Sequence, residues 1–385
     1  AFVLHVLETH RNEDYVHGSL ELGRRTGATI LHSSALEFKY GTPVHEGHQV
    51  RVGDVEVTTL ETPGHTDDSL SFVLRDRSVS DDPYAVLTGD ALFAGDVGRI
   101  DLYGEDQRER NARNLWRSIH GKLLPLGDGV LVAPAHGAGS VCGGKIADRA
   151  LTTIGYERAT NPWLALDEEE FVARKVAEHH YRPNYFERME EWNRDGPPFL
   201  GDTLLAPPLD LGEVKRLWKE GTYVLDVRDP PSFSGSHIPQ SINIWRNGLG
   251  SYAGWVLPYD VPIVVVDDHN DHMDTVVRSL SRLGYDWLVG YLAGGFYRWF
   301  IAAEPITTIE VWSVDDLREH LDDEDLYILD VRNVAHRSER GHIPGDHHAW
   351  VGHLGEVISD IPEDHRVAVY CDTGYKTSLA ASLLR

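Results

Sequence analysis

The run Tyr-Val-Leu-Asp-Val-Arg at residues 223–228 recurs as Tyr-Ile-Leu-Asp-Val-Arg at residues 327–332, and this repetition decides the fold of the second half of the chain. A His-Ile-Pro triplet at residues 237–239 recurs at residues 342–344, and a valine-rich run follows at nearly the same offset in both halves. Three matched segments at one spacing indicate two tandem copies of one module. Continuous apolar runs alternate with helical periodicity in each copy, which is typical of a mostly parallel α/β sheet covered on both faces.

The first 150 residues have a different pattern, in which short apolar runs end in glycine-rich turns. This spacing favours the strands of a sheet sandwich over a helical bundle. A helical stretch is predicted over residues 167–195, and the Pro/Gly cluster at residues 196–208 indicates a domain boundary. The predicted strands are residues 55–60, 71–74, 84–87 and 130–133.

Composition limits the classes of protein to consider. The 385 residues are 41% hydrophobic and 25% charged, which is ordinary for two or three globular domains. No apolar run reaches membrane-spanning length, and a formal charge of −25 argues against a nucleic-acid partner. The acidic balance suits either a high-salt environment or an ordinary acidic cytoplasmic enzyme. Only two cysteines, Cys142 and Cys371, are present, which predicts a reducing, cytoplasmic setting.

Three candidate metal ligands each follow an apolar run and stand beside a glycine or a turn. They are His10 after Leu-Glu-Thr, His65 after Pro-Gly, and Asp90 after Thr-Gly. Two imidazoles and one carboxylate that leave open positions on the metal suit non-haem ferrous iron and dioxygen chemistry. The pattern therefore predicts an oxygenase.

Together with His136 in Pro-Ala-His-Gly, these residues resemble the metallo-β-lactamase superfamily, whose first motif is His-x-His-x-Asp-His. Here Asn12 and Tyr15 stand at the second and fourth ligand positions of that motif, and neither is a normal replacement for imidazole on zinc. The mononuclear persulfide dioxygenases of the superfamily use only the positions that match His10, His65 and Asp90. The resemblance therefore implies one Fe(II) per chain.

Further residues are candidates for orienting the ligands or contacting the substrate. His136 is either a ligand-orienting residue or a bystander, and Cys142 lies either near the substrate sulfur or simply in the core. The changes at Asn12 and Tyr15 also support an alternative, in which the domain has lost its metal and serves as a scaffold. The full set of candidates is Asn12, Asp14, Tyr15, Arg99, His136 and Cys142.

The second repeat places a cysteine at the end of an apolar run and before a helix predicted over residues 378–384. Backbone N–H groups and a helix N-terminus at such a loop stabilise a thiolate, which can carry sulfane sulfur. With Asp-Val-Arg and His-Ile-Pro-Gly upstream, the loop resembles that of the rhodanese family, although Lys376 stands where arginine is usual. The predicted catalytic loop is Cys371, Asp372, Thr373, Gly374, Tyr375 and Lys376.

The first repeat lacks this cysteine. Matching residues 263–268 to residues 367–371 leads us to place Asp268 at the cysteine position. A carboxylate cannot carry sulfane sulfur, so we predict that this copy is inactive in sulfur transfer.

The predicted fold is thus a metallo-β-lactamase-like αββα sandwich (residues 1–205), followed by an inactive rhodanese-like α/β domain (206–305) and a rhodanese domain with Cys371 (306–385). The arrangement resembles persulfide dioxygenase–rhodanese fusions of bacterial sulfide detoxification. Compared with them, the sequence is expected to lack the opening strands of the first domain and the end of the last. Appended modules on a sheet-sandwich enzyme favour a homo-oligomer.

The predicted reaction oxidises a low-molecular-weight thiol persulfide with O2 to sulfite, which then takes sulfur from Cys371 to give thiosulfate. The first alternative is a zinc-dependent thioester hydrolase, similar to glyoxalase II, fused to the rhodanese pair. The second is a metal-free scaffold that retains only sulfur transfer through Cys371.

Overall fold

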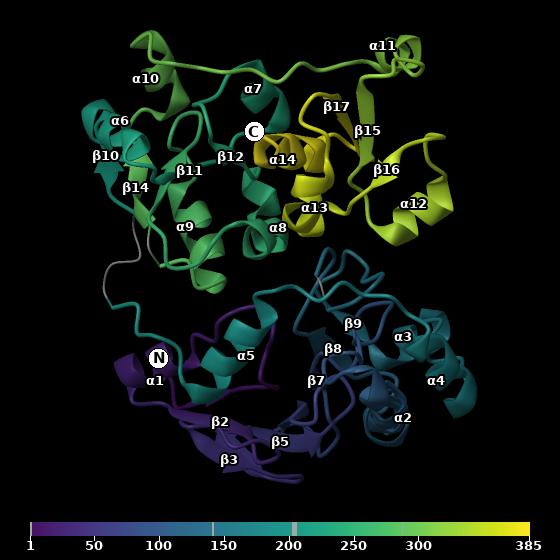
Figure 1. Ribbon diagram of the computed structural model, residues 1–385. Helices are drawn as coiled ribbons and strands as arrows, with labels where there is room; N and C mark the ends of the chain where they lie inside the picture. Colours follow the sequence, from purple (N-terminus) through teal and green to yellow (C-terminus); the bar gives the residue numbers. More distant parts are fainter. Residues whose placement is uncertain (1, 141, 202–205, 287) are drawn as a thin grey trace. The chain divides into compact units, whose positions relative to one another are not determined.

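The computed structural model describes residues 2–140, 142–201, 206–286 and 288–385, and the chain forms two compact units, 1–199 and 200–385 (Figure 1). The boundary predicted at residue 205 lies outside the described residues, and the boundary at 305 stays a prediction. No helix in the described part of the chain is long and apolar enough to cross a membrane.

The first unit contains two sheets whose facing sides form a hydrophobic core. Leu31 and Val44 from the small sheet pack with Leu70 and Phe72 from the large one. The small sheet is parallel, in the order β1-β2-β3, and the large sheet has the order β4-β5-β6-β7-β8-β9 and is antiparallel except between β7 and β8. The strands are β1 His5–Leu7, β2 Thr29–Ser33, β3 Thr42–Val44, β4 Gln49–Val52, β5 Val55–Glu61, β6 Leu70–Asp76, β7 Ala85–Gly89, β8 Leu131–Pro134 and β9 Thr152–Thr153.

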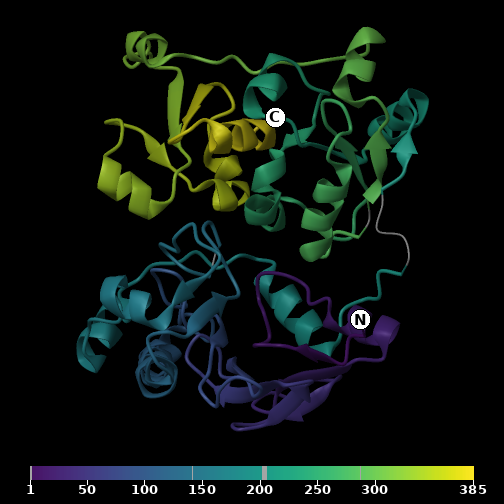
Figure 2. The ribbon, with the colours of Figure 1, turned by 180° about the vertical axis from the view of Figure 1, so that it is seen from behind.

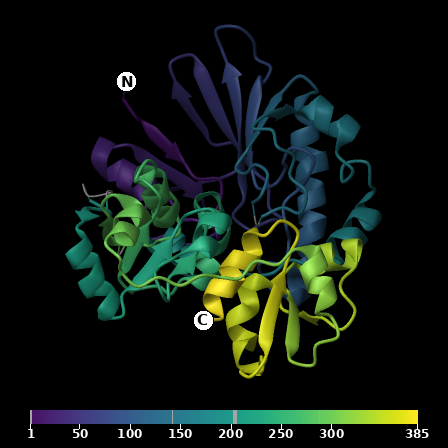
Figure 3. The same cartoon turned by 90° about the horizontal axis from the view of Figure 1, so that it is seen from above.

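Helices cover the outer faces of the two sheets. A second core joins Val86 and Val132 of the large sheet to Leu115 of α2 and Phe171 of α4, and α1 packs on the small sheet. In Figure 3 the strands of the first unit are purple to blue, and the blue helix α2 lies beside the blue strands. The predicted αββα sandwich and its four predicted strands are confirmed. The helices are α1 Ser19–Thr26, α2 Arg108–Ser118, α3 Ile154–Thr160, α4 Glu168–Val176 and α5 Phe186–Asp195, with short turns η1 Glu105–Gln107, η2 Ile119–Leu123 and η3 Leu124–Leu126.

The single helical stretch predicted over residues 167–195 is wrong, because residues 177–185 separate α4 from α5. Pro183 lies in this break and has no backbone N–H to donate within a helix. The start of α4 is capped as its sequence allows: Asp167 accepts a hydrogen bond from the Glu170 backbone N–H.

The second unit contains two parallel sheets, one from each repeat. The first sheet has the order β10-β14-β13-β11-β12, and the second has the order β16-β15-β17. The strands are β10 Pro208–Leu209, β11 Tyr223–Asp226, β12 Ile242–Asn243, β13 Ile263–Val266, β14 Leu288–Leu292, β15 Leu326–Asp330, β16 His347–His348 and β17 Arg366–Tyr370.

The helices of this unit flank the sheets as the α/β pattern predicts. Val214 of α6 and Trp299 of α10 pack on Val224 and Val264 of the first sheet. The predicted helix at 378–384 begins three residues earlier, directly after Gly374. The helices are α6 Leu211–Lys219, α7 Pro230–Gly235, α8 Leu249–Val256, α9 Met273–Arg282, α10 Gly295–Ile301, α11 Val314–Glu319, α12 Val334–Arg340, α13 Leu354–Val357 and α14 Tyr375–Leu383, with turns η4 Arg246–Gly248, η5 Val351–His353 and η6 Ile358–Asp360.

Helix α14 of the second repeat is bonded to strand β12 of the first, and both views show them side by side (Figures 1 and 2). The Asn243 backbone N–H donates to Ser382 Oγ at 3.0 Å, and Ser378 Oγ donates to Asn243 Oδ1 at 2.6 Å. These three side chains are buried. The two repeats therefore share a polar contact inside one core.

The strand registers correct the predicted position of the missing cysteine. Val266 of β13 lies opposite Asp226, just as Tyr370 of β17 lies opposite Asp330. The residue that follows Val266 is Asp267, so Asp267 and not Asp268 occupies the position of Cys371. The error was a slip of one residue within two adjacent aspartates.

Candidate metal centre and sulfur-transfer loop

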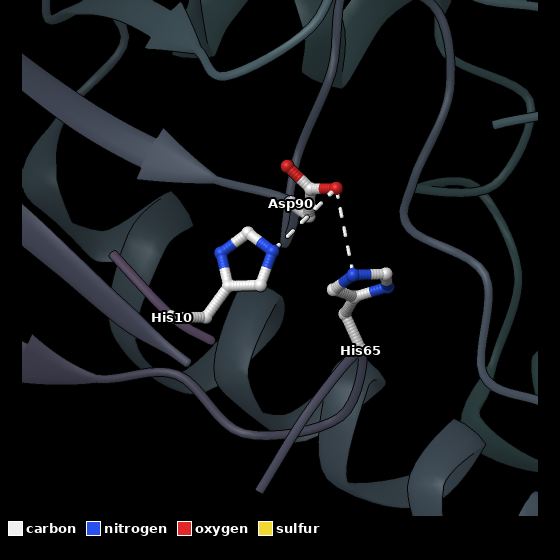
Figure 4. Close-up of side chains that lie close together, drawn as sticks. All are labelled: His10, His65 and Asp90. Atoms are coloured by element: carbon white, nitrogen blue, oxygen red, sulfur yellow. Dashed lines mark ion pairs between the residues drawn. The ribbon is translucent and has the colours of Figure 1, made fainter. Parts of the chain in front are cut away.

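His10, His65 and Asp90 lie together at one end of the sandwich, in the loops that follow β1, β5 and β7 (Figure 4). All three side chains are buried, and one ligand atom from each lies within 4.8 Å of the others. His65 Nε2 is 3.4 Å from Asp90 Oδ2, and His10 Nε2 is 3.9 Å from the same oxygen. The structure thus brings together the three residues that the sequence proposed as ligands.

Hydrogen bonds on the far side of each imidazole fix its orientation. Thr9 Oγ1 lies 3.0 Å from His10 Nδ1, and the Arg99 carbonyl oxygen lies 2.9 Å from His65 Nδ1. Each ring therefore turns its Nε2 atom toward Asp90, as metal-binding histidines do when their other nitrogen is held by an outer partner.

The donor atoms meet the requirement for a metal. Both Nε2 atoms and both Asp90 carboxylate oxygens are buried and have no hydrogen-bond partner among the described residues, although they lie within ion-pair distance of one another. Buried polar atoms are almost always hydrogen-bonded. Four unpaired donor atoms that point toward one another are therefore consistent with a metal ion bound between them. Two imidazoles, which bind a metal in their neutral form, and one carboxylate are a ligand set that suits ferrous iron.

Charges within the cluster shift its titration. Burial alone would raise the pKa of Asp90, but His136 and His10 outweigh it and hold that pKa well below the usual range. Burial lowers the pKa of His10. Burial would also lower the pKa of His65, but the adjacent Glu13 carboxylate raises it to about 9. Neighbouring groups of opposite charge therefore outweigh burial at Asp90 and His65, whereas burial dominates at His10.

Asn12 and Asp14, at the other positions of the metallo-β-lactamase motif, are engaged by neighbouring groups. Asn12 Oδ1 accepts hydrogen bonds from the backbone N–H groups of Asp14 at 2.8 Å and Tyr15 at 3.3 Å. The amide oxygen is therefore engaged by its own turn. Asp14 Oδ2 lies 3.6 Å from His136 Nε2, and burial raises the pKa of Asp14 to about 6.

His136 contacts the predicted ligand set directly. Its Nε2 atom lies 3.2 Å from Asp90 Oδ2, and its ring faces the Tyr15 ring at a centroid distance of 5.9 Å. Burial would lower its pKa, but Asp90 and Asp14 raise it to about 10. This position fits the role of a residue that orients Asp90.

Cys142 and Arg99 take distinct places beside the cluster. Cys142 is buried, its Sγ donates to Glu13 Oε1 at 3.4 Å, and burial raises its pKa well above that of a free thiol. The Arg99 guanidinium is bidentate to Asp101 and lies over the Phe186 ring at 5.5 Å. Arg99 therefore reaches the site through its carbonyl oxygen.

Glu13 is a residue of this cluster that sequence reasoning missed. It is fully buried, with Oε1 3.2 Å from His65 Nε2 and Oε2 3.9 Å from His10 Nε2. His65 and His10 outweigh the effect of burial and hold the pKa of Glu13 at about 2. The signal was its place between two altered motif positions, in a loop that already supplies a ligand.

In the second unit, Cys371 follows β17 at the start of the loop that leads into α14. The thiol is half-buried, and its Sγ accepts the Gly374 backbone N–H at 3.2 Å. Gly374 adopts φ 85°, a left-handed conformation that favours glycine. Thr373 is exposed, and the partly exposed Tyr375 ring lies 4.8 Å from Trp245 of the first repeat.

Basic side chains surround Asp372, the residue that follows Cys371. Asp372 lies 3.0 Å from His336, 3.3 Å from Arg340 and 3.5 Å from Lys376. Burial would raise the pKa of Asp372, but the hydrogen bond with His336 and the charges of Lys376 and Arg340 lower it. The loop therefore joins a thiol, a donated N–H and several positive charges that can receive an anion.

The matching loop of the first repeat has the same backbone without the thiol. Asp267 Oδ2 accepts the Asn270 backbone N–H at 2.8 Å, and Asn270 adopts φ 65°. The Asn270 amide also bonds Asp267 and accepts the Gly294 backbone N–H. A polar pocket of about 330 Å³ lies here, lined by residues that include Arg246, His272 and Tyr375.

Comparison with known proteins agrees with both units. The rhodanese-like domain family matches residues 210–302 and 313–385. A crystal structure of a metallo-β-lactamase from Staphylococcus aureus is similar over 75% of this chain and 84% of its own, with TM-score 0.65 and 27% identity. The chain is a fusion of a metallo-β-lactamase fold with rhodanese-like domains.

Curated relatives are similar to part of this metallo-β-lactamase–rhodanese fusion. The human mitochondrial persulfide dioxygenase ETHE1 is 30% identical over 171 residues, which are 44% of this chain and 60% of the relative. Hydroxyacylglutathione hydrolase GloC of Haemophilus influenzae is 27% identical over 41% of this chain and 74% of its own. The chain spans about half the length of the first curated relatives it matches.

Proposed function

We propose that the first unit oxidises a low-molecular-weight thiol persulfide to sulfite with O2, at one Fe(II) held by His10, His65 and Asp90. The observation that carries this proposal is a ligand set built for one metal: three converging orphan donors, with Asn12 turned onto its own backbone. The similarity to proteins named persulfide dioxygenase supports the substrate class.

The balanced reaction converts RSSH, O2 and water into RSH, sulfite and two protons. Fe(II), when bound, supplies a site where persulfide sulfur and dioxygen can meet. Thr9 and the Arg99 carbonyl hold the two imidazoles, and His136 holds the Asp90 carboxylate. The buried site, with His10, His65 and Asp90 each at most 2% exposed, keeps bulk water away from the reacting sulfur.

In the second unit, we propose that the Cys371 thiolate attacks the outer sulfur of a second thiol persulfide, whose S–S bond breaks and releases the thiolate RS⁻, so that Cys371 becomes a persulfide. Sulfite attacks the outer sulfur of a Cys371 persulfide, the S–S bond breaks, and thiosulfate leaves with Cys371 as a thiolate. The Gly374 N–H stabilises that thiolate, and Lys376 and Arg340 attract the anionic sulfite. We propose a role in sulfide detoxification in the cytoplasm.

The rival proposal is a zinc-dependent thioester hydrolase in the first unit, favoured by the similarity to GloC. It predicts close to two equivalents of zinc and no dependence on O2. The engagement of Asn12 by the backbone weighs against a second metal.

The decisive experiment is dioxygen uptake by the Fe(II)-reconstituted chain after a pulse of glutathione persulfide. Uptake should scale with bound iron, and H65A should lower it by roughly 100-fold or more, because a ligand is lost. H45A is the matched control, since His45 is an exposed histidine of the same unit. Unchanged uptake in H65A, or none at stoichiometric iron, would overturn the dioxygenase proposal.

A further inference from the structure

The carboxylate of Glu13 faces the same two imidazole nitrogens as Asp90 does. Its Oε1 lies 3.2 Å from His65 Nε2 and its Oε2 lies 3.9 Å from His10 Nε2, compared with 3.4 and 3.9 Å for Asp90 Oδ2. Glu13, Asp90 and Cys142 offer ligand atoms within 4.8 Å of one another, in a group that shares Asp90 with the group of His10, His65 and Asp90. Two carboxylates therefore converge where the resemblance assigns one.

These separations match the spacing of ligand atoms around a single ion. With metal–ligand bonds of about 2.0–2.2 Å, neighbouring ligands at right angles lie about 3 Å apart and opposite ligands about 4.3 Å apart. The four carboxylate–imidazole distances, 3.2 to 3.9 Å, fall inside this range, with Asp90 using one oxygen atom and Glu13 using a different oxygen atom for each imidazole.

Glu13 also has an unsatisfied atom. The side chain is fully buried, Oε1 accepts from the Cys142 thiol at 3.4 Å, and Oε2 has no hydrogen-bond partner among the described residues. A buried carboxylate oxygen without a partner is unfavourable unless a cation binds it. Nearby Glu8 also has a buried oxygen, Oε2, without a hydrogen-bond partner. It differs in its neighbours, because its Oε1 contacts Ser19, Tyr40 and His17, and among the described residues no ion pair joins Glu8 to His10 or His65.

We propose that Glu13 is a fourth protein ligand of the metal, which makes the site one of two histidines and two carboxylates. This inference rests on the single-metal site of the proposed function but not on its reaction. A second carboxylate cancels the charge of a divalent ion within the site and leaves one fewer position for substrate. The added oxygen ligand favours hard ions such as Mn(II) and Fe(II).

The test measures binding, not turnover. The metal-free chain is titrated anaerobically with Co(II) and with Fe(II), and Co(II) coordination is read from its visible absorption bands. E13Q should bind roughly 10- to 100-fold more weakly than the wild type, with changed Co(II) bands, and E8Q should bind like the wild type. Acetate should restore binding and the bands to E13A, which also shows that this variant is folded.

Three results separate the possibilities. If E13Q binds Co(II) as tightly as the wild type with the same spectrum, Glu13 is only a counter-ion of His65 and the proposal is wrong. If the wild type takes up neither ion, the single-metal site fails together with this proposal. If binding depends on Glu13 but no dioxygen uptake follows, the fourth ligand stands and the dioxygenase function falls.

Discussion

The loops at 267–270 and 371–374 share one backbone conformation, but their first side chains differ in chemistry. In both, the first side chain accepts the N–H of the residue three positions later, and that residue is left-handed, with φ of 65° at Asn270 and 85° at Gly374. A carboxylate in one loop and a thiol in the other occupy the same place after the same strand. This shared loop conformation, the backbone cradle, is therefore the same whether its first residue is an aspartate or a cysteine.

The surroundings of the two loops differ more than their backbones. Lys376 lies 3.5 Å from Asp372, and the equivalent position in the first repeat holds His272. The Asn270 side chain joins its loop to Gly294, whereas Gly374 has no side chain and leaves the space beside Cys371 open. The second loop therefore combines a thiol, a lysine and a glycine, and the first loop has none of these three at the matching positions.

Removal of the Cys371 thiol from the second repeat is expected to have the largest effect on sulfur transfer. C371S should lower sulfur transfer from thiosulfate to cyanide by roughly 1000-fold or more, because the hydroxyl cannot form a persulfide. The measurement is thiocyanate formation by the full-length chain. D267S is the control, and transfer above a few per cent in C371S would show that another group carries the sulfur.

The converse change gives a smaller signal. D267C in the C371S background places a thiol in the cradle of the first repeat, yet should recover less than about 1% of wild-type transfer, since His272 replaces Lys376 and Asn270 closes the loop. Iodoacetamide labelling of the introduced thiol would confirm that it is present and reactive. Recovery to a tenth of wild-type activity would mean that the backbone cradle alone is sufficient.

The smallest expected effect concerns the histidines of the two His-Ile-Pro segments. His237 is buried, lies 2.8 Å from the Phe233 carbonyl and stacks on its ring at 3.8 Å, whereas His342 is exposed beside Asp346. Burial lowers the pKa of His237 to about 4. Protons therefore bind preferentially to the unfolded state once the pH falls below about 6.5, and stability is lost progressively toward pH 4.

Between pH 7 and pH 5 this linkage should remove about 1–2 kcal/mol from the free energy of unfolding of the first repeat. H237F keeps the ring stack, lowers stability at pH 7 and should remove this part of the pH dependence. Hydrogen exchange of the β11 and β13 amides across this range provides the measurement. Equal slopes in the wild type and H237F would contradict the assignment.

Much of the fold could be predicted because hydrophobic periodicity and repetition are local signals. The four predicted sandwich strands and the two α/β repeats were found this way. His10, His65 and Asp90 could be proposed because each directly follows an apolar run, and such ends meet at one edge of a sandwich. The break at Pro183 was missed because the helical periodicity on both sides hid it.

The details of the site depend on contacts between loops that sequence does not reveal. The burial of Glu13 against His65 depends on how two distant loops meet, and a charged residue in a loop is ordinarily solvated. The Arg99 guanidinium suggested a substrate contact, but its fork pairs with Asp101, two residues along the chain. The Asp267 assignment required the strand register, because two adjacent aspartates are indistinguishable by pattern.

The bonds from Asn243 to Ser378 and Ser382 give the first repeat a structural role toward the second. Helix α14 begins one residue after Gly374. The bonds to Asn243 that anchor this helix therefore also orient its first turn relative to Cys371. A domain without a nucleophile of its own can thus act as a bracket for its neighbour's.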